Sequence, residues 1–268
     1  PTSTVLSKQD YQYDAESNRI TLTENNVRTT TYSYDSLNQL ATVDYSNVSS
    51  TSDLIFVYDS YGNRKASIGP VDSMSYSYAN NANELTGYSY NSGKLSVDLQ
   101  YDGNGSLKSE AYSRFGVSDK NIVYSWNSQN RLKQVQYSYN SLITIPTNTL
   151  KFTYDDYGNR TMKTSASGLQ TIDTTYYLND GLTVLYELNS FGNVTKSIIR
   201  GLDQIAEINA SGTIKYTHQD ILGSTILVTN ESGNINQEYE YDPFGQLIGG
   251  IMNNDDSLNS RYLYTGQE

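Results

Sequence analysis

Tyr58-Asp59-Ser60-Tyr61-Gly62-Asn63-Arg64 is one copy of a short pattern that recurs along the chain. The pattern is an aromatic residue, an acid or its amide, a polar turn, and then a basic or aliphatic residue. Other copies begin at Tyr13-Asp14, Tyr34-Asp35, Tyr101-Asp102, Trp126-Asn127 and Tyr154-Asp155, and a degenerate copy begins at Tyr78. From Tyr13 to Trp126 the copies follow at intervals of 20 to 25 residues, the short end of the range for solenoid-type arrays. The chain is therefore predicted to be an array of small, similar units.

Each copy has the chemistry of a tight turn between two strands. The Asp or Asn after the aromatic residue can accept hydrogen bonds from backbone N–H groups two or three residues further on. Gly62 and Gly158 lie three residues after this acid, where glycine can adopt a positive φ without a Cβ penalty. Arg64 and Arg160 occupy the basic position that ends the pattern. These features predict a hairpin with a type I turn and a bulge.

The segments between the turns have the alternation of β-strands. Residues 95–101, Leu-Ser-Val-Asp-Leu-Gln-Tyr, place Leu, Val, Leu and Tyr on one face and Ser, Asp and Gln on the other. No window of the sequence has a convincing helical period, and Thr, Tyr, Val and Ile are abundant beside Asn, Ser and Gly turns. Because a single hairpin is marginal in water, neighbouring hairpins must stack. We predict an all-β antiparallel ribbon of hairpins.

Composition excludes several classes of function. The net charge of −11 and the pI near 4.5 disfavour nucleic acid and anionic membrane surfaces as partners. The absence of cysteine excludes disulfides and thiolate chemistry. The longest apolar run, residues 54–58, is far shorter than the roughly 20 residues of a spanning helix. Because the chain begins at Pro1 without a signal-like segment, we expect it to be an internal part of a longer polypeptide.

The aromatic content is strongly biased toward tyrosine, with 26 Tyr against 5 Phe and 1 Trp. Tyrosine rings can pack between neighbouring repeats while their hydroxyls stay wet or hydrogen-bonded at the rim. An alternative interpretation is an aromatic platform for sugars, which would need a local cluster of rings with convergent polar groups. The even spread of the tyrosines along the chain favours packing.

Candidate catalytic and metal-binding residues are few. His218 is the only histidine, and Asp220 lies close to it in sequence, but a turn stabilised by side-chain to backbone hydrogen bonds explains both residues. Residues 102–106, Asp-Gly-Asn-Gly-Ser, alternate oxygen ligands yet lack the glycine and bidentate glutamate of an EF-hand. We predict no enzymatic activity, no metal site and no cofactor.

The C-terminal part of the chain carries four further motifs in a fixed order. They are His218-Gln219-Asp220-Ile221-Leu222-Gly223-Ser224, the turn at residues 229–234, Tyr241-Asp242-Pro243-Phe244-Gly245 and Tyr264-Thr265-Gly266. This order resembles the core segment of the bacterial Rhs proteins, a YD-repeat family related to the C components of insecticidal toxin complexes and, more distantly, to teneurins. The repeats and core motifs together cover nearly the whole chain. We interpret residues 1–175 as the repeat array and residues 176–268 as degenerate repeats continuous with the start of the core.

The resemblance implies a function. In that family the repeats wind as a curved β-ribbon into a hollow shell that holds a C-terminal toxic effector, and many members free the effector by aspartate-dependent self-cleavage. Asp242-Pro243-Phe244-Gly245 belongs to the earlier core motif, and the cleavage signature is expected after Glu268, so no protease role is assigned to Asp242. The implied function is a structural shell segment of a secreted or cell-surface protein, with the remainder of its polypeptide as partner. The alternative is an adhesive or carbohydrate-binding repeat module that contacts cell-surface glycans.

Overall fold

A computed structural model describes residues 5–25, 28–46, 53–69, 73–79, 83–139, 148–168, 170–201, 204–249 and 263–266. Nearly all regular structure in these residues is β-strand, and 21 of the strands belong to one antiparallel sheet. The helical segments in this part of the chain are two single turns of 3-10 helix, η1 (Asn91–Gly93) and η3 (Tyr264–Gly266). The prediction of an all-β ribbon of repeated hairpins is confirmed.

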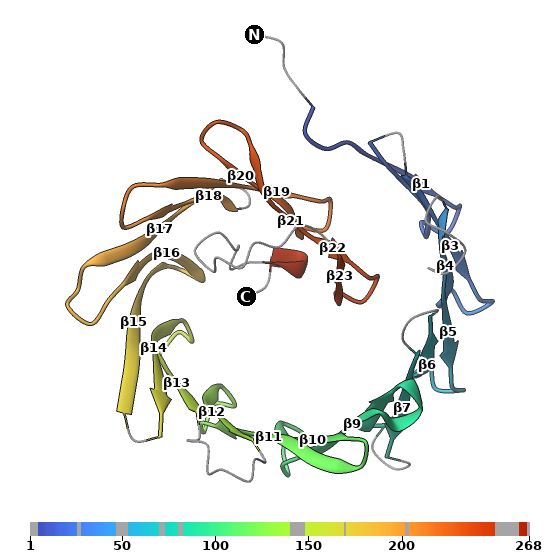
Figure 1. Ribbon diagram of the computed structural model, residues 1–268, viewed down its shortest axis with the longest axis horizontal. Coiled ribbons are helices and arrows are strands. Elements are labelled where there is room, and N and C mark those ends of the chain that lie inside the picture. The colour runs from blue at the N-terminus through green and yellow to red at the C-terminus, as the bar shows by residue number, and fades with distance from the viewer. Residues whose placement is uncertain are drawn as a thin grey trace. The chain divides into compact units, whose positions relative to one another are not determined.

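The chain divides into two compact units, of which the first comprises residues 1–130 and 135–147. Its strands are β1 (Gln9–Tyr13), β2 (Arg19–Glu24), β3 (Arg28–Tyr34), β4 (Leu40–Ser46), β5 (Leu54–Tyr58), β6 (Arg64–Ile68), β7 (Ser73–Tyr78), β8 (Leu85–Tyr90), β9 (Leu95–Tyr101), β10 (Leu107–Arg114), β11 (Val117–Trp126) and most of β12 (Leu132–Tyr139). Figure 1 shows β1 to β11 following one another in chain order.

The second unit comprises residues 131–134 and 148–268. Its strands are β13 (Asn148–Tyr154), β14 (Arg160–Ser167), β15 (Gln170–Asp180), β16 (Thr183–Leu188), β17 (Val194–Arg200), β18 (Gln204–Asn209), β19 (Ile214–Gln219), β20 (Thr225–Asn230), β21 (Ile235–Glu238), β22 (Glu240–Tyr241) and β23 (Leu247–Gly249). The change of repeat character predicted at residues 175 and 176 lies within β15, whereas the compact units divide near residue 131.

The repeat turns shift the strand register in the way that a bulged hairpin requires. At the hairpin of β5 and β6, Tyr58 pairs with Arg64 but Val57 pairs with Ala66, so Lys65 is the extra residue. The same one-residue shift precedes the aromatic residue in the hairpins that begin at Tyr13, Tyr34, Tyr78 and Tyr154. A bulge of this kind bends the strand locally and fixes which side chains face each side of the sheet.

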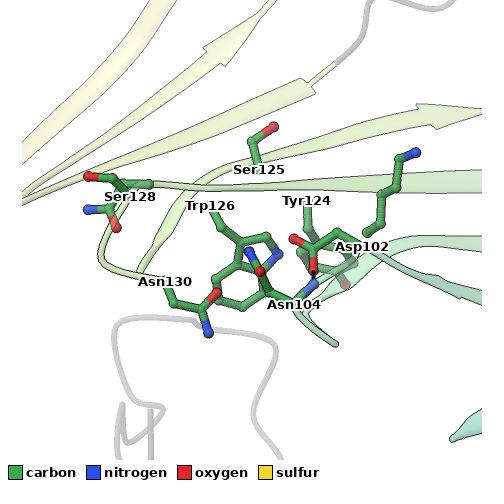
Figure 2. A pocket seen from close by; sticks show the side chains of 9 residues that line it. Asp102, Asn104, Tyr124, Ser125, Trp126, Ser128 and Asn130 are labelled. Atoms are coloured by element: carbon green, nitrogen blue, oxygen red, sulfur yellow. Dashed lines mark hydrogen bonds between the residues drawn. The ribbon is translucent and has the colours of Figure 1, made fainter. Parts of the chain in front are cut away.

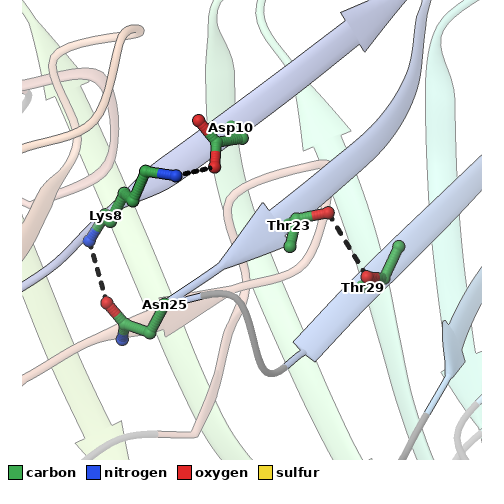
Figure 3. Close-up of polar contacts among 5 residues, drawn as sticks. All are labelled: Lys8, Asp10, Thr23, Asn25 and Thr29. Carbon is green, nitrogen blue, oxygen red and sulfur yellow. Dashed lines mark hydrogen bonds and ion pairs between the residues drawn. The ribbon is translucent and has the colours of Figure 1, made fainter.

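Polar contacts also connect β1, β2 and β3 near the turn that joins β2 to β3 (Figure 3). Lys8 donates its backbone N–H to Oδ1 of Asn25 at 2.8 Å, and its ammonium group contacts Asp10. Across the strands, the hydroxyls of Thr23 and Thr29 are 3.3 Å apart. Threonine pairs on facing strands stabilise a sheet by fractions of a kcal/mol each, roughly 0.2–1.

The buried side chains of the first unit are few and small. Val43 in β4 and Val97 in β9 have 0% and 1% of their surface exposed, and Phe56, Ile122 and Val135 are also buried. Along β9 the burial alternates, with Asp98 and Gln100 exposed. The alternation predicted for residues 95–101 is confirmed, and it places a thin apolar layer on one side of the sheet.

Around β17 to β19 the second unit buries charge. Glu207 in β18 is buried, and so is its neighbour Ala206, although adjacent strand residues point to opposite faces. The Glu207 carboxylate lies 2.9 Å from the Lys196 ammonium and accepts a hydrogen bond of 3.0 Å from the Gln204 amide. In the strand register Glu207 also faces Lys215, which is buried too. Both faces of β18 are therefore covered, and the buried glutamate is held by an ion pair and an amide.

Candidate functional site

The acid of each repeat organises its own turn. In the turn after β5, Oδ1 of Asp59 accepts hydrogen bonds from the backbone N–H groups of Tyr61 and Asn63, both at 2.9 Å. Oδ2 accepts a third from the Asn63 side-chain amide at 3.0 Å, and this donor holds the pKa of Asp59 below its ordinary value. Gly62 closes the turn with φ of +84°. Each group of the turn therefore has a local structural use.

The same two backbone hydrogen bonds recur at most of the repeat turns that have an Asp or Asn in this position. The residues that accept both through one oxygen include Asp14, Asp35, Asp102, Asn189, Asn209, Asp220, Asn230 and Asp242. Asp155 accepts the second of them from Asn159 at 2.8 Å. Because asparagine serves as well as aspartate, the turn requires an acceptor oxygen and not a charge.

The aromatic residue of each repeat hydrogen-bonds to the repeat before it. The Tyr58 hydroxyl donates to the carbonyl of Leu40, the first residue of β4, at 2.9 Å. Equivalent inter-repeat hydrogen bonds run from Tyr34 to Arg19, Tyr78 to Arg64, Tyr101 to Leu85, Trp126 to Leu107, Tyr154 to Leu132 and Tyr241 to Thr225, at 2.7–3.0 Å. Burial raises the pKa of the Tyr58 hydroxyl above its ordinary value.

Sequence reasoning assigned the tyrosines to ring packing and missed this donor. The signal was present in the composition, because phenylalanine offers the same ring but is rare. The replacement at Trp126 carries the same information, since its indole N–H donates to the Leu107 carbonyl at 2.8 Å. In β15 the donor is not aromatic at all, and the Asn179 amide reaches the Arg160 carbonyl at 3.0 Å. A hydrogen-bond donor, more than a ring, is what the position requires.

The basic residue after the turn lies between aromatic rings of neighbouring strands. The Arg64 guanidinium carbon is 6.0 Å from the ring centre of Phe56 and 4.6 Å from that of Tyr76. Arg160 has the same arrangement, at 5.8 Å from Phe152 and 4.6 Å from Tyr177. Such cation–π contacts contribute about 0.5–2 kcal/mol, more where they are desolvated. The arginines therefore connect adjacent strands through their charge and their flat surface.

Three of the predicted core motifs come together in the second unit. The Tyr264 ring lies 5.5 Å from the Tyr241 ring, and its hydroxyl donates to the Pro243 carbonyl at 3.0 Å. Gly245 has φ of +87° and lies directly beneath that ring, where an added Cβ would be 2.4 Å from Cδ1 of Tyr264. These contacts place the Tyr-Asp-Pro-Phe-Gly turn against η3.

The first core motif holds the other side of the same segment. The Thr225 N–H donates to the Leu263 carbonyl at 2.9 Å, and the Thr265 N–H donates to the buried Ser224 hydroxyl at 3.0 Å. Gly223, with φ of +82°, shapes the turn that precedes them, and Gly266 ends η3. Residues 263–266 are therefore fixed to the start of β20 by main-chain contacts.

His218 and the nearby carboxylates are engaged separately. Nε2 of His218 is 3.0 Å from the Thr229 hydroxyl, and burial lowers the pKa of the imidazole. Asp220 accepts the backbone N–H groups of Leu222 and Ser224 within its own turn. Asp242 does the same in the next turn. Within the described residues these three side chains occupy structural positions and form no hydrogen bond with one another.

In the described part of the chain, no three His, Asp or Glu side chains gather as a metal ion would require. Among those same residues, none of the helical segments has the length and apolar character of a membrane span.

A pocket of about 560 Å³ lies in the first unit beside the single tryptophan (Figure 2). It lies between two successive repeat turns, at residues 102–106 and 127–130, and Trp126 and Tyr124 of β11 contribute aromatic surface to it. Asp102, Asn104 and Asn130 contribute polar groups. We call it the Trp126 pocket.

The chain is similar in sequence to a small part of longer proteins. No family model matches the chain. It is 29% identical over 217 residues to the tRNA nuclease WapA of Bacillus subtilis strain 168, and 28% identical over 217 residues to the tRNA3(Ser)-specific nuclease WapA of Bacillus spizizenii. Each match covers 80% of this chain and 8% of the WapA protein.

Among solved structures, the TcdB2-TccC3-Cdc42 crystal structure matches with a TM-score of 0.45 and 17% identity, over 97% of this chain and 17% of that one. The Tc holotoxin pore of Photorhabdus luminescens matches with a TM-score of 0.46 and 16% identity, over 98% of this chain and 16% of that one. In sequence, the chain is related to a small part of proteins named as WapA nucleases.

Proposed function

We propose that this chain is a structural shell segment of a larger toxin-type protein of the Rhs kind, and that the shell encloses a C-terminal effector. The observation that carries the proposal is the inter-repeat hydrogen bond. It fastens one hairpin to the next within each compact unit, from Tyr34 to Trp126 in the first and at Tyr154 in the second, and so supports a wall built from hairpins that could not be stable alone.

The chain itself is proposed to have no enzymatic activity. The nuclease named in WapA belongs to proteins of which this chain spans about 8%, so that activity need not reside in the matching part. Three side chains could in principle act in catalysis, namely His218, Asp220 and Asp242. Each has a structural hydrogen-bond partner that explains its presence. The partner is then the remainder of the chain's own polypeptide, held as cargo, and the location is secreted or at the cell surface.

Protease protection tests the enclosure. The natural polypeptide that carries this chain is treated with a nonspecific protease, alone and after the inter-repeat hydrogen bonds are removed by combining Tyr58→Phe with Tyr101→Phe. We expect a downstream segment that resists cleavage in the parent and becomes sensitive in the double variant. Tyr61→Phe is the matched control, because Tyr61 is 83% exposed and its hydroxyl has no described partner. A downstream segment equally sensitive in all three proteins would contradict the proposal.

The absence of activity has its own test. The purified chain should remain intact over days, and His218→Ala or Asp242→Asn should change its stability at most. Self-cleavage, or hydrolysis of peptide, ester or glycoside substrates, that either substitution abolishes without unfolding the chain would contradict a passive role.

The second candidate function is a carbohydrate-binding repeat module at the cell surface. The observation that favours it is the Trp126 pocket, which combines aromatic and polar lining in one place. The two functions are distinguishable, because adhesion predicts glycan binding without any protected downstream segment.

A further inference from the structure

The Trp126 pocket differs from an ordinary gap between hairpins in how its lining is built. Its nine lining residues come from two successive turns and from the ends of β10 and β11, all within residues 102–130 of the first unit. A volume of about 560 Å³ lies inside the range of roughly 300–1,000 Å³ that small-molecule sites occupy. Figure 2 shows Asp102, Asn104 and Asn130 gathered around the Trp126 indole.

Asp102, like Asp35, Asp220 and Asp242, differs from three other turn acids at one atom. In the turns of Asp14, Asp59 and Asp155, Oδ2 accepts a hydrogen bond from the amide of an asparagine four residues later. At Asp102 the corresponding residue is Ser106, whose hydroxyl donates instead to Oδ1 of Asn130 at 2.6 Å.

The consequence is an unused acceptor at the pocket wall. The Asp102 carboxylate uses Oδ1 for its turn, and among the contacts of the described residues its Oδ2 receives no hydrogen bond. The side-chain amide of Asn104, two residues later in the same lining, is also without a protein partner in that part of the chain. A carboxylate oxygen and an amide therefore face the same space, ready for a ligand's hydroxyl groups.

The aromatic wall is fixed in place and leaves its surface to the pocket. The indole N–H of Trp126 is committed to the Leu107 carbonyl, and the Tyr124 hydroxyl to Oε1 of Glu110 at 2.6 Å. Their polar ends are thus satisfied, and what they offer the pocket is apolar ring surface. No aromatic ring or cation of the described residues stacks on Trp126. The ring is held by its N–H rather than by a neighbouring ring.

We propose that the Trp126 pocket binds a neutral carbohydrate. The C–H face of a pyranose ring packs on the Trp126 indole, and the sugar hydroxyls donate to Oδ2 of Asp102 and pair with the amides of Asn104 and Asn130. A sugar is the class of ligand with one apolar face and a rim of hydroxyl groups that this lining complements. The lining carries one carboxylate, Asp102, and one ammonium group, Lys108, so its own charges balance, and the net charge of −11 of the chain disfavours phosphates and acidic sugars. The proposal rests on the second candidate function above, whose site and ligand class it names, and it is independent of any enclosed effector.

The single tryptophan makes the site directly measurable. Its emission, excited where tyrosine does not absorb, is followed while the full chain is titrated with glucose, galactose, mannose, N-acetylglucosamine and short oligomers of each. We expect a saturable change with at least one of these sugars. The absence of a saturable response to all of them would overturn the proposal.

Asp102→Asn is the decisive variant. Asparagine holds the same turn at residues 189, 209 and 230, so the fold is retained, while the free acceptor at Oδ2 becomes a donor and the reporter tryptophan stays. We expect about tenfold weaker binding, the effect of one charge-assisted hydrogen bond. Asp35→Asn is the matched control, because Asp35 has the same two turn hydrogen bonds but does not line the pocket.

Two further measurements keep the proposal open to refutation if the first variant is destabilised. Asn104→Ala removes one ligand amide from an exposed turn position and should weaken binding severalfold. Trp126→Tyr, assayed by calorimetry, keeps a donor for Leu107 but removes the indole surface, and should weaken binding as well. Unaltered affinity in Asp102→Asn and Asn104→Ala, or an equal loss in Asp35→Asn, would show that the sugar binds elsewhere.

Discussion

Removing one tyrosine hydroxyl should lower the free energy of unfolding by the contribution of one hydrogen bond to a main-chain carbonyl group. Tyr101→Phe keeps the ring and deletes only the hydroxyl that donates to the Leu85 carbonyl at 2.9 Å. A neutral hydrogen bond contributes about 0.5–1.5 kcal/mol net, and a buried acceptor left without a partner costs about 1–3 kcal/mol. Tyr101 is only half-buried, so water will replace part of the loss. We expect the free energy of unfolding to fall by about 1 kcal/mol.

The assay is urea unfolding, followed by far-ultraviolet circular dichroism and by Trp126 emission. Tyr58→Phe should cost the same, because its hydroxyl makes the equivalent bond to Leu40 at the same distance. The two sites are two repeats apart and share no contact, so the double variant should lose about 2 kcal/mol.

The control and the refutation use the same substitution in a turn. Tyr61→Phe should leave the midpoint unchanged, since that side chain is 83% exposed. Equal losses for Tyr61→Phe and Tyr101→Phe would mean that hydration or strand propensity, and not the inter-repeat hydrogen bond, sets the cost. An unchanged midpoint for Tyr101→Phe would mean that the inter-repeat hydrogen bond does not contribute to stability.

Five other variants probe the turns and the buried charge, four by urea midpoint and one by the pH dependence of stability. Gly158→Ala should lower the free energy of unfolding by about 1–3 kcal/mol, because φ is +97° and the added Cβ would be 2.9 Å from Arg131. Gly62→Asn should lower it by less than about 1 kcal/mol, since asparagines adopt a positive φ at the same position of other turns. Glu207→Ala should cost about 3–5 kcal/mol by leaving the Lys196 charge without its buried partner, and Glu207→Leu less. The pKa of Asp59 is lowered from its ordinary 3.8 in the folded chain, so the stability that its carboxylate contributes is present above pH 3.8 and is lost as the pH falls through the folded pKa. Asp59→Asn should therefore make the chain less sensitive to acid. An unchanged dependence of stability on pH would contradict the role given to the Asp59 carboxylate.

The turns were predictable from the sequence because their chemistry is local. Asp59 bonds only to residues two and four positions later, and Gly62 adopts its positive φ within the same five residues. An acceptor followed three residues later by glycine or asparagine carries that information in the residue types themselves. The alternating strands followed for the same reason, since a period of two requires no knowledge of the partner strand.

The inter-repeat hydrogen bond was not predictable in this way, because its acceptor is a main-chain carbonyl. Leu40 could be any residue and still accept from Tyr58, so only the donor leaves a trace in the sequence. Glu207 shows a second limit: period-two reasoning assigns every strand an exposed face, but both Ala206 and Glu207 are buried. What covers a strand on its second face depends on residues distant in sequence, which a period of two does not specify.

Successive turns contact one another through their side chains. The residue that ends each turn, four positions after the turn acid or five after Ala79 in the degenerate copy, reaches over the positive-φ residue of the next turn. Short side chains meet asparagine there, as in Asn18 to Asn38, Asn63 to Asn83 and Ser106 to Asn130. Long side chains meet glycine, as in Gln39 beside Gly62, Glu84 beside Gly105 and Arg131 beside Gly158.

The two kinds of pair alternate along the chain, and this alternation discriminates between registers. A slip of one repeat would place Asn18 against Gly62, where the Asn18 amide would lose its acceptor, and Gln39 against Asn83 in place of a glycine. Identical repeats would pair equally well in any register, and such sheets are prone to slippage. A slip of two repeats restores the size match, but it leaves two hairpins without partners and forfeits their inter-repeat hydrogen bonds. The order of the hairpins is therefore determined jointly by the turn side chains and by the tyrosine donors, and neither set alone would be sufficient.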